Sequence, residues 1–238
     1  LRIAVSEINE DSYDLVVVDG DLSNEGSDEQ LKNVKSILDG IRHPLYVLPG
    51  NHENTWSQSA TKTFVDLWGN DRFITEVDSL VVVGINCGPF MKMGDGHIKQ
   101  EDLHWLKATL DERVKPGKKV VSFNHYPINP DLDNWRDYVK VLEKYPVIAH
   151  INGHYHSWQQ YKGGDIDAAM VRALDMRKGD YGYTIMDIDG DWVHIYNKEI
   201  GKQPKAKFAW AVKPEIKPIK DTETVEFVQP EGFTVEKV

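Results

Sequence analysis

Two histidines, His154 and His156, stand one residue apart, directly after a glycine and the apolar run 147–151. The run predicts a buried strand, and side chains two positions apart in an extended segment point to the same side. Because imidazole is the commonest metal ligand among protein side chains, the pair indicates a metal site at the end of this strand. A lone pair of this kind is more often structural, so the assignment depends on matching ligands elsewhere.

Matching polar residues follow three other apolar runs, which cover residues 14–18, 44–48 and 119–123. The residues that follow these runs within a few positions are Asp21, Asn51, His52 and His125. In open α/β sheets, ligands bind in the crevice beyond the carboxyl ends of the strands. We therefore expect all four strand ends to open onto one edge of a sheet. Glycine precedes three of the four motifs, which lets the backbone turn sharply near a bound ion.

The combined donor set contains one carboxylate, one amide oxygen and three imidazoles: Asp21, Asn51, His125, His154 and His156. Nitrogen and oxygen donors without sulfur suit Mn, Fe, Zn or Ni better than Cu(I) or an iron–sulfur cluster. Five donors exceed the four of a structural zinc site, and a carboxylate can bridge two cations, so two metal ions are expected. His52 is the expected proton donor or phosphate contact. Cys87, the single cysteine, is expected to be a core residue.

Alternating strands and helices must position these residues. Beyond the four strand runs, strands are expected at residues 72–75 and 79–86, and helices at residues 1–12, 27–38, 58–69, 100–114 and 135–144. Three further strands, at 166–173, 181–188 and 192–198, have no helices between them, and Asp189-Gly190 predicts a hairpin turn. The pattern predicts an α/β fold with mixed sheets, completed by a C-terminal antiparallel meander.

Taken together and in this order, the motifs resemble those of the calcineurin-like metallophosphoesterases over roughly residues 14–200. The resemblance implies a four-layer α/β/β/α sandwich with two metal ions at the sheet edge. By the motif match, Asp21 is the bridging carboxylate and His156 a ligand of the first metal. The implied ligands of the second metal are Asn51, His125 and His154. His52 is implied to stabilise the transition state or to protonate the leaving oxygen.

One motif of the family is absent from the printed sequence. The opening D-x-H motif, which supplies an Asp and a His to the first metal, is expected on a strand before Leu1. We therefore interpret residues 1–200 as an N-terminally incomplete catalytic domain whose first metal site retains only Asp21 and His156. Residues 201–238, with alternating Lys and Pro, are expected to form a tail, a linker or the start of a further small β module.

The resulting prediction is a metal-dependent phosphoesterase in which a metal-bridging hydroxide attacks a phosphomonoester or a phosphodiester. The alternative is a non-catalytic or one-metal binding or scaffold module of the same fold. A net charge of −10 (28 basic and 38 acidic residues) disfavours extensive nucleic-acid binding and leaves a small phosphate ester as the expected substrate. No apolar run approaches the roughly 18 residues of a membrane helix, and the composition leans towards an exported, periplasmic bacterial protein. Trp56 and Tyr155, beside the site motifs, could line a substrate cleft or serve only in packing.

Overall fold

The computed structural model describes residues 1–89, 94–175, 181–202 and 210–214. The strands of its larger sheet are β3 (Phe73–Val77), β4 (Leu80–Gly84), β5 (Lys119–Phe123), β6 (Val147–Asn152), β7 (Gln159–Gly163) and β8 (Ile166–Met170). They are ordered β3-β4-β5-β6-β8-β7. The strands from β4 to β8 in this order pair in parallel, whereas β3 and β7 pair antiparallel at the two edges. Parallel strands buried on both faces explain why β4, β5 and β6 are mostly apolar.

A second layer contains two smaller sheets. The strands β1 (Val16–Asp19) and β2 (Leu45–Leu48) pair in parallel. The strands β9 (Gly182–Asp189), β10 (Trp192–Glu199) and β11 (Trp210–Val212) form an antiparallel meander in the order β11-β10-β9. The turn between β9 and β10 is made by residues 190 and 191, one position later than predicted, because Asp189 pairs with Trp192.

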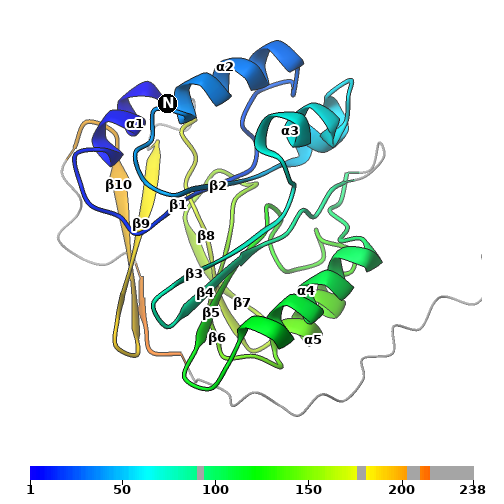
Figure 1. Ribbon diagram of the computed structural model, residues 1–238, viewed down its shortest axis with the longest axis vertical. Coiled ribbons are helices and arrows are strands. Elements are labelled where there is room, and N and C mark those ends of the chain that lie inside the picture. The colour runs from blue at the N-terminus through cyan, green and yellow to red at the C-terminus, as the bar shows by residue number, and fades with distance from the viewer. Residues whose placement is uncertain (90–93, 176–180, 203–209, 215–238) are drawn as a thin grey trace, which may run out of the picture.

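Helices cover both outer faces, so the chain forms the four-layer α/β/β/α sandwich (Figure 1). The helices are α1 (Arg2–Ile8), α2 (Asp28–Leu38), α3 (Thr61–Trp68), α4 (Gln100–Arg113) and α5 (Trp135–Leu142), with a π-helical turn η1 (His52–Trp56). α4 and α5 pack on the larger sheet through Leu106 and Val141, and α2 and α3 pack near β2 through Leu38 and Phe64. α2 begins where the Ser27 hydroxyl accepts a hydrogen bond from the Gln30 amide, as its sequence predicts.

The pleat of β5 divides the interior into two cores. Val120 packs in the core beneath α4 and α5, whereas Val121 packs in the core shared with Val193 and Ile195 of β10. Successive strand residues point to opposite faces, so a single apolar strand can serve both cores. This burial on both sides fixes the strand whose carboxyl end leads to His125.

Three local predictions differ from the structure. β7, a polar edge strand, has no apolar alternation that would announce it, and the helix expected at 58–69 begins only at Thr61, after the π-helical turn. β11 pairs with β10, so part of the segment expected to be a tail belongs to the meander. Residues 203–209 and 215–238, which hold most of the expected tail, linker or further β module, lie outside the described residues.

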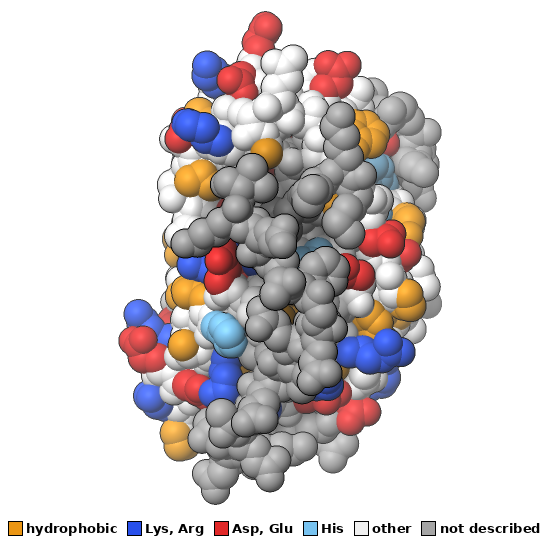
Figure 2. Space-filling model, turned by 90° about the vertical axis from the view of Figure 1, so that its right-hand side faces the viewer, with side chains coloured by type: hydrophobic (Ala, Val, Ile, Leu, Met, Phe, Trp, Pro, Cys, Tyr) orange, Lys and Arg blue, Asp and Glu red, His pale blue; other side chains and the backbone are white. Residues whose placement is uncertain are grey.

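Surface charge is mixed on the face drawn in Figure 2. Basic and acidic side chains lie there among scattered apolar ones, and the coloured side chains form no continuous basic stripe. Among the described residues, no helix is long and apolar enough to cross a membrane.

His150, fully buried in β6, makes stability depend on pH. Its Nδ1 lies 2.9 Å from Ser122 Oγ, and burial lowers its pKa from 6.5 to about 3. Below pH 6.5 the unfolded chain gains a proton that the folded chain does not accept until about pH 3. The folded state therefore loses stability as the pH falls through this window, by about 2 kcal/mol between pH 7 and pH 5.

We expect His150→Asn to remove about 2 kcal/mol from the pH 7 to pH 5 difference in unfolding free energy, measured with urea at both pH values. The asparagine amide can retain a hydrogen bond to Ser122. His104→Asn, at an exposed position on α4, should leave the difference unchanged. If His150→Asn and wild type lost equal stability over this range, the buried imidazole would not be the group responsible.

Candidate metal centre

The loop after β1 delivers Asp21 to the site through a left-handed turn. Gly20 has φ of 79° and Asp21 has φ of 48°, a region open to glycine and tolerated by aspartate. A Cβ on Gly20 would lie 2.4 Å from His125 Nδ1. A Cβ on Gly50 would lie 2.3 Å from the Asp21 backbone nitrogen. The two glycines therefore allow the loops that carry Asp21 and Asn51 to approach each other and His125.

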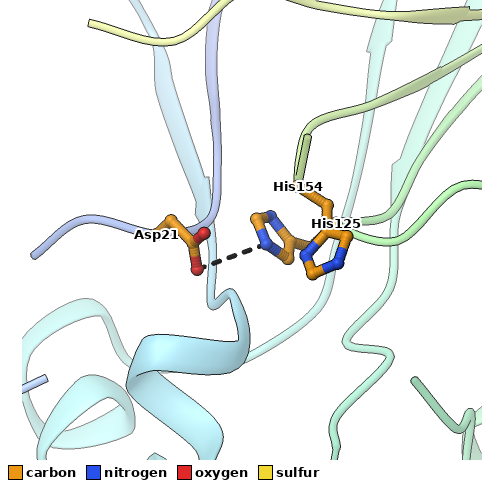
Figure 3. A group of neighbouring side chains, drawn as sticks. All are labelled: Asp21, His125 and His154. Carbon is orange, nitrogen blue, oxygen red and sulfur yellow. Dashed lines mark ion pairs between the residues drawn. The ribbon is translucent and has the colours of Figure 1, made fainter. Parts of the chain in front are cut away.

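Asp21, His125 and His154 offer donor atoms that all lie within 4.8 Å of one another (Figure 3). His125 Nε2 is 3.2 Å from Asp21 Oδ1 and 3.2 Å from Asn51 Oδ1. His154 Nδ1 is 3.1 Å from the same Asn51 oxygen. Four of the five expected ligands thus converge from the ends of β1, β2, β5 and β6. Their nitrogen and oxygen atoms fit a cation such as Mn²⁺, Fe²⁺, Zn²⁺ or Ni²⁺.

His156 lies on the other side of the Asp21 carboxylate. Its Nε2 is 3.5 Å from Asp21 Oδ2, and its Nδ1 is 3.5 Å from Asp175 Oδ2. Asp21 therefore presents one oxygen to His125 and the other to His156, as a bridging carboxylate must. Asp175, which follows β8, was not expected at the site; no motif surrounds it, and only the fold brings it there.

The backbone between His154 and His156 differs from the extended segment expected. β6 ends at Asn152, and both histidines have left-handed backbone, with φ of 71° and 58°. The two imidazoles consequently diverge instead of lying side by side: His154 faces Asn51, whereas His156 faces Asp21. The inference that both point to one side of a strand is wrong, although both do reach the site.

His52 lies beside Asp21 with a fixed ring orientation. Its Nδ1 is 2.7 Å from the Asn24 carbonyl oxygen, which can only accept, so Nδ1 carries the proton. Its Nε2 then faces the site, 3.8 Å from Asp21 Oδ2. The backbone N–H of His52 also donates to Asp21 Oδ1, at 3.3 Å.

Glu53 connects two of the site loops by hydrogen bonds. It is completely buried, and its carboxylate accepts from the Gly50 amide at 2.9 Å and from the Ser23 amide at 3.3 Å. These bonds join the loop of Asp21 to the loop of Asn51, so Glu53 supports both ligands without contacting a metal ion itself. Burial raises the pKa of the Glu53 carboxyl above its ordinary value.

The electrostatics of the cluster favour a bound cation. Burial opposes the charge of Asp21, but the neighbouring His125, His156 and His52 hold its pKa well below the usual range. Burial likewise opposes protonation of His125, yet the Asp21 carboxylate raises its pKa to about 9. Burial and the nearby His125 lower the pKa of His154 to about 4, so its nitrogen lone pair is free at neutral pH. A metal ion would replace the His125 proton as the partner of Asp21.

The family model for calcineurin-like phosphoesterases matches residues 1–158. The chain belongs to the calcineurin-like phosphoesterase family. A protein of Arcobacter nitrofigilis named "Probable glycerophosphodiester phosphodiesterase" is 26% identical over 210 residues, which are 79% of this chain and 75% of that protein. A "Probable cyclic nucleotide phosphodiesterase" of Vesicomyosocius okutanii is 26% identical over 81% of this chain and 88% of its own length.

The family fold is also seen in a solved structure. The crystal structure of a dimetal phosphatase from Danio rerio superimposes with a TM-score of 0.66 at 15% sequence identity. The match covers 90% of this chain and 88% of that one. At this level of identity the likeness concerns the architecture alone, and it agrees with the four layers described above.

In this calcineurin-like phosphoesterase, Asp19 contacts the site through its backbone oxygen. Its backbone oxygen accepts from His125 Nδ1 at 2.8 Å, which turns Nε2 of that ring towards Asp21. Both of its carboxylate oxygens are buried without a hydrogen-bond partner among the described residues, and burial raises its pKa to about 8.

A cavity of about 1360 Å³ begins at Asp19 and Asp21 and extends between β1 and β9. Among the described strands, β1 pairs only with β2 and β9 only with β10, so each has one open edge. Residues of both strands line the cavity, and Val82 and Val121 of the larger sheet also contribute to its wall. The layer formed by the two small sheets is thus interrupted beside the site, on the side of His156.

Proposed function

We propose that this chain is the catalytic unit of a metal-dependent phosphoesterase that hydrolyses a small phosphodiester. The observation that carries the proposal is the convergence of Asp21, His125 and His154 within 4.8 Å, with the ring of His52 beside Asp21. Membership of the calcineurin-like phosphoesterase family supports hydrolysis, and relatives named as phosphodiesterases favour a diester over a monoester.

Each residue has a role in this proposal. Asn51, His125 and His154 would hold one cation, while Asp21 would share its carboxylate between that cation and a second one near His156. The cations would supply a water of lowered pKa and would neutralise charge that develops on the phosphoryl oxygens. His52, with protons on both Nδ1 and Nε2, would donate the Nε2 proton to the leaving oxygen as the phosphorus–oxygen bond breaks.

The test is hydrolysis of bis(p-nitrophenyl) phosphate and of p-nitrophenyl phosphate by protein loaded with Mn²⁺, Zn²⁺, Ni²⁺ or Fe²⁺. We expect the diester to be cleaved faster than the monoester, and EDTA treatment to abolish both reactions until metal is restored. Protein that binds metal but cleaves neither ester would favour the alternative, a non-catalytic or one-metal binding module of the same fold.

We also propose that a segment with the D-x-H motif implied by the family resemblance fills the cavity beside β1 and completes the metal site near His156. Among the described residues, the open edges of β1 and β9 and the Asp19 carboxylate, which has no hydrogen-bond partner there, support the proposal.

The number of bound metal ions distinguishes an incomplete site from one completed by the D-x-H motif. We expect the chain Leu1–Val238 to retain about one ion after desalting, and a form that also carries a D-x-H motif to retain about two, measured by plasma mass spectrometry. Equal metal content in the two forms would contradict this assignment.

A further inference from the structure

Two large aromatic side chains beside the metal centre are exposed to solvent. Trp56 is 61% exposed and Tyr155 is 47% exposed. Trp56 ends the π-helical turn that begins at His52, and Tyr155 lies between His154 and His156. In the part of the chain that the structure describes, the other exposed large apolar side chains are at the N-terminus and at Trp192 of the β9–β10 hairpin.

Both rings are anchored on residues of the site. The indole of Trp56 lies 4.3 Å from the ring of His52, with 33° between the ring planes. The ring of Tyr155 meets the ring of His154 at 4.8 Å and 65°. His154 is itself stacked on Tyr126 at 4.0 Å. The two exposed rings are therefore held at fixed positions relative to the groups that would bind the phosphate.

Exposed aromatic rings at a phosphate site can stack on a planar group attached to that phosphate. Stacking of a nucleobase on such a ring is sequence-tolerant and strong, because every base has a π face. A glycerol or choline group offers no planar face, so it would gain much less from the same rings. The relatives are named as glycerophosphodiester or cyclic nucleotide phosphodiesterases. Of these two substrate classes, only the nucleotides offer a planar group on which Trp56 and Tyr155 could stack.

The acidic residues around Tyr155 restrict how many phosphate groups the substrate can carry. The carboxylates of Asp131 and Asp95 lie near the Tyr155 hydroxyl. Acidic groups on this side of the site would repel a substrate with additional phosphates, and they would accept hydrogen bonds from base amino groups or ribose hydroxyls.

We propose that Trp56 and Tyr155 bind the base of a nucleoside phosphodiester that carries a single phosphate. The assignment rests on the proposed phosphoesterase function and narrows its substrate class. The ring of Trp56 packs against His52 and would stack on the base, while Tyr155 would contact the base on the side of His154. Both would determine specificity, since neither is among the residues proposed to hold the metal ions or to donate the proton.

Binding of two monophosphates to the metal-loaded protein tests the proposal without relying on turnover. AMP and glycerol 3-phosphate present the same phosphate group and differ in the planar base. By isothermal titration, we expect AMP to bind at least about 10-fold more tightly than glycerol 3-phosphate. Trp56→Ala should weaken AMP binding about 5- to 100-fold, the loss that one stacked ring predicts, and should change glycerol 3-phosphate binding less than about 2-fold.

Matched variants separate stacking from folding. Trp56→Phe should restore most of the AMP affinity, Tyr155→Ala should lower it as Trp56→Ala does, and Trp192→Ala should leave it unchanged. Equal wild-type affinity for the two monophosphates, or an equal loss of both in Trp56→Ala, would overturn this assignment while diester hydrolysis still stood. Absence of both binding and hydrolysis would instead overturn the phosphoesterase function on which it rests.

Discussion

Asp21→Asn is expected to lower kcat/KM for a phosphodiester by about 10³-fold or more and to deplete the protein of bound metal. The carboxylate offers Oδ1 to His125 at 3.2 Å and Oδ2 to His156 at 3.5 Å. An asparagine side chain has one oxygen and no charge, so it can neither bridge two cations nor balance their positive charge. The activation free energy should therefore rise by several kcal/mol. Metal content after desalting and steady-state kinetics measure the two effects.

Loss of activity in Asp21→Asn would not result from misfolding, because asparagine fits the same backbone conformation. Asp21 has a left-handed backbone with φ of 48°, and asparagine adopts this conformation readily. The matched control is Asp66→Asn, which removes an exposed carboxylate paired with Lys62 on α3. A surface pair of this kind contributes at most about 0.5 kcal/mol, so activity and metal content should not change. Asp21→Asn with wild-type metal content and activity would rule out Asp21 as the bridging ligand.

The strands that carry the site could be predicted from the sequence, because each is a short apolar run followed by residue types that bind metal ions. β1, β2, β5 and β6 are short, mainly apolar strands, and polar residues follow each of them within a few positions. Parallel pairing of neighbouring strands accounts for Asp21 beside Asn51 and for His125 beside His154. The single sheet edge that we expected is wrong, because β1 and β2 form one sheet and β5 and β6 belong to another, so the two pairs of ligands meet across two layers.

Features that depend on distant parts of the chain could not be found in this way. Asp175 reaches His156 only because β8 lies next to β6, and nothing in its local sequence marks it. β7 is a polar edge strand, whose exposed positions need no apolar alternation. The left-handed bends at His154 and His156 follow from where Asn51 and Asp21 lie, and the residue types alone carry no such information.

His52→Gln is expected to lower kcat about 10²- to 10⁴-fold for a diester with an alkoxide leaving group, with metal content unchanged. His52 Nδ1 is held by the Asn24 carbonyl at 2.7 Å, so Nε2 is the nitrogen that faces the site. A glutamine can occupy the space but cannot deliver a proton to the leaving oxygen. The loss should be much smaller for a p-nitrophenyl ester, because its acidic leaving group departs without a proton.

The dependence on the leaving group distinguishes proton transfer from substrate binding. If His52 only positioned the phosphate, His52→Gln would raise KM and would affect alkyl and p-nitrophenyl esters equally. His43→Gln is the control, since that imidazole contacts the Ile8 carbonyl at 3.1 Å and serves α1 instead of the site; its kinetics should match wild type. Proton donation therefore requires a fall in kcat that grows with the basicity of the leaving oxygen, because only a basic alkoxide needs the second proton, which Nε2 carries in the imidazolium form.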